Sequence, residues 1–136
     1  MASIASTAMD ALGKAISDRD AGQIADLWAE DIVVWHGATG VGQSKQENVG
    51  LLAGVFAVTS ELQYTDIVRH EFEGGLVQQH KLTGKFDDGS PTPSLAACLV
   101  VLVNDEGKFT RIDEYFDASH FAAVFERLEA LSASNA

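Results

Sequence analysis

Four strand-like segments joined by short turns fill the second half of the chain, and they constrain its fold more than any other feature. They cover residues 61–72, 76–86, 95–103 and 108–116. The turns between them are rich in glycine, aspartate and asparagine, which reverse the chain within a few residues. Strands joined so tightly pair antiparallel, because parallel neighbours need a long crossover. The second half therefore predicts one antiparallel sheet.

Apolar residues recur at helical spacing in four places outside that sheet. The periodic stretches begin near Met9, Asp20, Ser44 and Asp117, and Ser44 opens a capping box. Residues 32–36 are β-branched or aromatic and predict a further strand before a glycine loop. The expected order is ααβαββββα, an α+β fold in which a strongly curved, mostly antiparallel sheet wraps around the N-terminal helices.

Length and composition predict a single domain. The chain has 136 residues, of which 46% are hydrophobic, enough for one core and too few for two. We expect residues 1–136 to form one domain, with an ordered core at about 9–131. Residues 132–136 are small and polar, and we expect them to be a flexible tail.

The charge balance limits the classes of partner that the protein can bind. A net charge of −11 with nine lysines and arginines argues against nucleic acid and anionic membrane surfaces. The N-terminus lacks the basic flank and apolar core of a signal peptide, and the only cysteine, Cys98, allows no disulfide framework. We therefore expect a cytoplasmic protein.

One carboxylate stands alone on an apolar strand face near the end of the sheet. Alternation places Ile112, Glu114 and Phe116 on the same face of the last strand. Burial there would favour the protonated form of the acid, which suits proton transfer in an apolar pocket. Alternatively, Glu114 pairs with a basic residue at the rim of the sheet, as single glutamates on strands commonly do.

Two of the four histidines are candidates for the same pocket. His36 ends the first strand, and His80 shares a strand face with Gln78 and Leu82. Either could instead be a hydrogen-bonded histidine in or near the core. No HxH or HxxxH spacing occurs, so we expect neither a metal site nor another cofactor.

The chain resembles the nuclear-transport-factor-2-like (NTF2-like) superfamily over about residues 9–131. The resemblance rests on the helical hairpin, on residues 27–31 (LWAED) running into a strand, and on residues 107–117 (GKFTRIDEYFD). It implies a cone-shaped cavity like that of SnoaL-like polyketide cyclases, ketosteroid isomerases, scytalone dehydratases and limonene-epoxide hydrolases. It also implies a homodimer, which we expect to form through the outer sheet face.

The resemblance also suggests roles for individual residues. His36 matches the position of the catalytic aspartate of ketosteroid isomerases, whereas the positions of their oxyanion donors hold Leu12 and Leu99, which cannot donate a hydrogen bond. Glu114 matches a water-activating aspartate of limonene-epoxide hydrolases, whose arginine and aspartate on a middle strand find no clear match. The SnoaL-like cyclases, with an acid/base residue and a histidine-rich pocket, are the nearest fit.

Two functions remain open from the sequence. The favoured one is cofactor-independent acid/base chemistry by Glu114 and His36 on a small, hydrophobic, oxygenated molecule, such as isomerisation, cyclisation, dehydration or epoxide hydrolysis. The alternative is a non-catalytic module that binds a small ligand or a protein in the same cone. The residues expected to line the pocket are His80, Trp35, Tyr64, Phe56, Leu99, Ile112 and Phe116.

Overall fold

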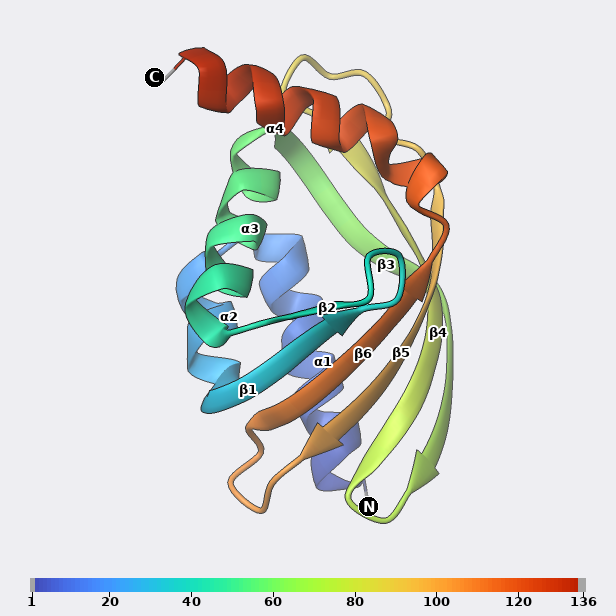
Figure 1. Cartoon of the computed structure of the whole chain (residues 1–136). Coiled ribbons are helices and arrows are strands. Elements are labelled where there is room, and N and C mark those ends of the chain that lie inside the picture. The colour runs from blue at the N-terminus through green and yellow to red at the C-terminus, as the bar shows by residue number, and fades with distance from the viewer. Residues whose placement is uncertain (1, 135–136) are drawn as a thin grey trace.

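A computed structural model describes residues 2–134 and shows helices packed against one curved sheet (Figure 1). The helices are α1 (Ile4–Asp18), α2 (Ala21–Leu27), α3 (Lys45–Ala57) and α4 (Ala122–Ser134), preceded by the short 3₁₀ helix η1 (Ala118–Phe121). The strands are β1 (Trp28–His36), β2 (Val41–Gln43), β3 (Thr59–Phe72), β4 (Gly75–Phe86), β5 (Leu95–Val103) and β6 (Phe109–Phe116). The α+β class and the mostly antiparallel sheet are confirmed.

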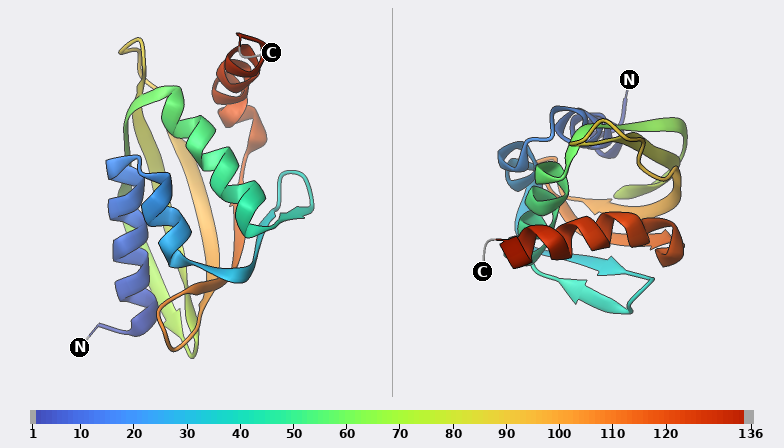
Figure 2. Two further views of the ribbon diagram at one scale, coloured as in Figure 1. Left: turned by 90° about the vertical axis from the view of Figure 1, so that its left-hand side faces the viewer. Right: turned by 90° about the horizontal axis from the view of Figure 1, so that it is seen from above.

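The six strands lie in the order β2-β1-β6-β5-β4-β3. Among the strand pairs within residues 2–134, only β1–β6 is parallel, and the other four pairs are antiparallel. The helices α1, α2 and α3 stand on the concave side of the sheet, while α4 lies across one end (Figure 2). The cavity described below is lined by residues of both the sheet and the helices.

Several boundaries differ from the expected ones. The first helix begins at Ile4, because Ser3 caps it, and Trp28 starts β1 instead of closing the second helix. The glycine loop contains the unexpected strand β2, which pairs with the end of β1. The expected flexible tail is helical as far as Ser134, and residues 135 and 136 lie outside the described part of the chain.

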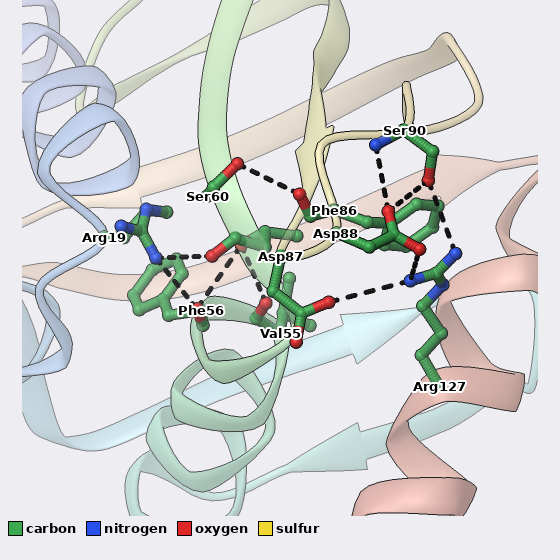
Figure 3. A network of polar contacts seen from close by, with 10 residues as sticks. Arg19, Val55, Phe56, Ser60, Phe86, Asp87, Asp88, Ser90 and Arg127 are labelled. Atoms are coloured by element: carbon green, nitrogen blue, oxygen red, sulfur yellow. Dashed lines mark hydrogen bonds and ion pairs between the residues drawn. The ribbon is translucent and has the colours of Figure 1, made fainter.

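Two arginines secure the ends of the helices against the sheet (Figure 3). Arg19 donates to the backbone oxygen of Phe56 at 3.0 Å, so it joins the end of α1 to the end of α3. Arg127 of α4 lies 3.7 Å above the ring centroid of Phe86 and donates to Asp88 at 3.0 Å. The Arg127 contacts hold α4 against the segment that connects β4 and β5.

Candidate active site

A cavity of about 470 Å³ occupies the cone. Its volume lies in the range typical of small-molecule pockets, roughly 300–1,000 Å³. Its wall is mainly aliphatic and aromatic, with contributions from α1, α3, η1, α4 and strands β1 to β6. The polar side chains in this wall are His36, Thr39, Gln43, Asn48, Tyr64, His80 and Glu114.

Strand register brings His36 and Glu114 together. The two residues are direct partners in the parallel β1–β6 pair, so their side chains leave the sheet on the same face. His36 Nδ1 lies 3.1 Å from Glu114 Oε1. The histidine side chain is 14% exposed and the glutamate 31%, so the pair lies in the cavity wall with the carboxylate the more accessible.

Three residues behind His36 fix which of its nitrogens carries a proton. The indole N–H of Trp28 can only donate, so it binds the oxygen of the Asn48 amide at 3.0 Å. The nitrogen of that amide then donates to Gln43 Oε1 at 3.0 Å. The same oxygen lies 2.8 Å from His36 Nε2, which must therefore carry hydrogen.

It follows that His36 Nδ1 and Glu114 Oε1 share one proton. With Nε2 protonated, the contact is either a carboxylic acid donating to a neutral imidazole or an imidazolium donating to a carboxylate. The hydrogen bond with Glu114 raises the pKa of His36 above its usual value, partial burial opposes this rise, and Gln43 supports it. Protonation of His36 beside Glu114 is thus more favourable than protonation of an isolated histidine.

Other polar residues form a second group on strands β3 and β4. The rings of Tyr64 and His80 are stacked, with centroids 3.9 Å apart. Burial lowers the pKa of His80 to about 4, so its ring is neutral at pH 7. Burial, with the nearby charge of Glu114, raises the pKa of Tyr64, so its hydroxyl keeps its proton.

All but one of the residues expected in the pocket lie in its wall. His36, Glu114, His80, Tyr64, Phe56, Leu99, Ile112 and Phe116 line the cavity. Trp35 is the exception and does not line this cavity. Strand alternation turns Val34 and His36 inward, so Trp35 lies on the outer face against Tyr115, at 5.5 Å between ring centroids.

The sequence alone does not single out the three residues that orient His36, which are Gln43, Trp28 and Asn48. A signal existed for Asn48, which lies four residues before Leu52 and so shares the apolar face of α3, where it is buried. Within residues 2–134, no cluster of three histidine, cysteine or acidic side chains has the arrangement of a metal site.

Comparison with known proteins shows a shared fold. No model of a known protein family and no curated protein sequence matches the chain. Among solved structures, a protein from Catenulispora acidiphila with a ketosteroid isomerase-like fold, in complex with trimethylamine, matches with a TM-score of 0.70 at 15% identity, over 83% of this chain and 87% of its own.

Two further structures match over more of the chain. A candidate SnoaL-like polyketide cyclase from Shewanella denitrificans has a TM-score of 0.73 at 10% identity, covering 92% of this chain and 98% of its own. TerC, co-crystallised with polyporic acid, has a TM-score of 0.73 at 21% identity, covering 91% of this chain and 99% of its own.

None of the helices in the described part of this chain is long and apolar enough to cross a membrane.

Proposed function

We propose that this protein, which has the cone fold of the SnoaL-like and NTF2-like proteins, uses Glu114 and His36 to move a proton on a small, mainly apolar, oxygenated molecule. The observation that carries the proposal is the 3.1 Å contact between His36 Nδ1 and Glu114 Oε1 in the wall of an apolar cavity. An acid and a histidine joined in this way can act as general base and general acid.

The geometry leaves one oxygen of Glu114 available to a ligand. His36 occupies Oε1, and no side chain or backbone group in residues 2–134 donates a hydrogen bond to Oε2. Oε2 is therefore the base, and it removes a proton from a carbon next to a carbonyl group. The C–H electron pair forms the new C=C bond and the carbonyl π pair moves to oxygen, giving an enolate. If the compound also carries a β,γ double bond, the enolate is conjugated with it. Return of the proton to the γ-carbon then re-forms the C=O bond, leaves the double bond between the α- and β-carbons and completes an isomerisation.

The similar structures support a small-molecule ligand. One was solved in complex with trimethylamine and another was co-crystallised with polyporic acid, so both were crystallised together with small organic molecules. In this chain the wall of the cavity is mainly hydrocarbon, which favours ligands with few polar groups. We infer the same class of ligand here.

Proton exchange on a simple ketone tests the proposal. In D₂O, the protein should speed the replacement of the α-protons of 1-indanone by deuterium, which NMR follows directly. Glu114→Gln keeps the size of the side chain but removes the base, so the protein-dependent rate should fall roughly 10²-fold or more. Glu106→Gln, the same change in an exposed turn, should leave the rate unchanged.

The outcomes also separate catalysis from binding. If 1-indanone, α-tetralone and dihydrocoumarin bind saturably but none exchanges protons faster than in buffer, the cone is a binding module and the catalytic proposal fails. Equal exchange rates in the wild type and in Glu114→Gln would remove Glu114 from the mechanism.

We also propose that the outer face of the sheet forms a homodimer. Val100 and Leu102 lie on this face, and Leu102 is 41% exposed. Exposed apolar groups on a sheet commonly pack against another subunit. Light scattering at micromolar concentration should give twice the monomer mass, and Leu102→Glu should return the protein to the monomer.

A further inference from the structure

We propose that His80 and Tyr64 bind the carbonyl oxygen of a neutral ligand through two hydrogen bonds, and that Arg69 and Gln78 are positioning residues that keep the proton of His80 on Nε2. This inference deepens the proposed function, on which its catalytic consequence rests, by naming neutral carbonyl compounds as the ligand class. The binding site itself stands on separate contacts.

Arg69 fixes the orientation of the Gln78 amide. Its guanidinium can only donate hydrogen bonds, and its Nε lies 2.7 Å from Gln78 Oε1. Its Nη1 is held by Asp10 Oδ1 at 2.8 Å and by Ser6 Oγ at 3.0 Å, both on α1. The oxygen of the Gln78 amide must therefore face Arg69, and its nitrogen must face the other way.

The orientation of Gln78 decides the tautomer of His80. Gln78 is fully buried, and its Nε2 lies 2.9 Å from His80 Nδ1. Because an amide nitrogen only donates, Nδ1 must accept and therefore carries no hydrogen. The single proton of the neutral ring is on Nε2.

Two donors are thereby left without an acceptor from the protein. No group in residues 2–134 accepts a hydrogen bond from His80 Nε2 or from the Tyr64 hydroxyl, although both residues line the cavity. Neither atom is sealed off by the protein, so both donors are accessible from the cavity. A ligand oxygen that contacts both would satisfy them.

The charge of the site determines whether it binds a neutral or an anionic ligand oxygen. His80 and Tyr64 are both neutral at pH 7, and the carboxylate of Glu114 is near enough to influence the pKa of Tyr64. An anionic ligand would lose its hydration and face that carboxylate, with no positive charge from these two donors to compensate. A ketone, ester or lactone oxygen needs no such compensation. If Glu114 removes a proton, the same two donors stabilise the enolate oxygen.

The tautomer can be measured without a ligand. In ¹⁵N NMR spectra of the free protein at pH 8, His80 should show a protonated Nε2 and an unprotonated Nδ1. Gln78→Glu keeps the contact with Arg69 but has no N–H to donate, so the proton should move to Nδ1. Gln79→Glu makes the same change on the exposed face of β4 and should leave His80 as it is. A wild-type His80 protonated on Nδ1 would overturn the proposal.

Binding of a ketone tests the donors themselves. The protein should bind 1-indanone more tightly than indane, which has the same shape without the oxygen, and 1-indanone should shift the His80 Nε2 signal. His80→Phe and Tyr64→Phe should each reduce this preference by roughly two- to tenfold, and Gln78→Glu should reduce it as His80→Phe does. Equal binding of the two compounds by the wild type would refute the proposal.

The two proposals fail separately. Preference for the ketone without Glu114-dependent deuterium exchange would retain the carbonyl site and refute the catalytic function. Glu114-dependent exchange with no effect of His80→Phe on ketone binding would retain the catalysis and refute this inference.

Discussion

The central feature at the scale of single residues is one proton between two groups. His36 Nε2 is occupied by Gln43, so the proton of Nδ1 is the one that His36 and Glu114 exchange. The carboxylate is the main cause of the raised pKa of His36, while partial burial acts against it. Removal of the carboxylate should therefore lower the pKa of His36, because burial of the ring is then no longer opposed by that charge.

We predict that Glu114→Gln lowers the pKa of His36 below its wild-type value. The variant removes the negative partner but leaves the ring half-buried, so the neutral ring is favoured. The pKa can be measured from the ring-proton shifts of His36 in an NMR pH titration. Glu106→Gln serves as the control, and an unchanged titration in Glu114→Gln would mean that the 3.1 Å contact is not made in solution.

Sequence alone pointed to the two side chains of the proposed proton transfer but not to those that orient them. Glu114 and His36 stand out because strand alternation places each on an inward face. Their contact depends on the parallel β1–β6 register, which joins residues 78 positions apart and leaves no local pattern. The link from Trp28 through Asn48 to Gln43 likewise joins three separate elements.

At the scale of elements, β4 is placed by a close approach to β3 that only glycine allows. A Cβ atom on Gly84 would lie 2.0 Å from the backbone oxygen of Glu61, next to a register shift between the two strands. No side-chain movement could relieve such a contact, because the obstacle is backbone. The end of β4 therefore depends on this glycine.

We predict that Gly84→Ala destabilises the protein by about 1–3 kcal/mol, the usual cost of overpacking. Gly50→Ala is the matched control, since Gly50 is an exposed helical position with nothing within 4 Å of the new Cβ. That change should stabilise the protein by roughly 0.5–1 kcal/mol through helix propensity. Urea unfolding measures both, and equal stability of Gly84→Ala and the wild type would contradict the close approach.

The order of the elements was largely predictable, and the exceptions have local causes. Strands β3 to β6 follow from alternation and turn residues, as the confirmed antiparallel pairs show. Strand β2 has three residues in a glycine-rich loop and is defined by its pairing with β1. In the sequence, Trp28 continues the helical spacing of the apolar residues before it. In the structure, α2 ends at Leu27 and the backbone of Trp28 is extended.

At the scale of the whole molecule, two cavity histidines make stability depend on pH in opposite directions. The raised pKa of His36 means that its contribution is complete below about pH 6.5 and is lost as pH rises through the folded-state value. The lowered pKa of His80 means that its neutral state is fully favourable above about pH 6.5 and becomes costly as pH falls. Both effects favour maximal stability near pH 6.5.

We predict that the free energy of unfolding falls between pH 6.5 and 4 because His80 must remain neutral in the folded state. In this window the unfolded chain binds more protons at this position, so stability decreases as pH falls. With the pKa lowered to about 4, the loss reaches at most about 3 kcal/mol, and residual hydration of the ring reduces it.

The test compares urea unfolding of the wild type with that of His80→Gln across this pH range. The variant lacks the titrating ring, so its stability relative to the wild type should rise steadily as pH falls from 6.5 to 4. Tyr64→Phe alters the stacked partner without removing a group that titrates in this window, so its difference from the wild type should not vary with pH. A constant difference for His80→Gln would show that His80 takes up a proton as easily in the folded protein as in the unfolded chain.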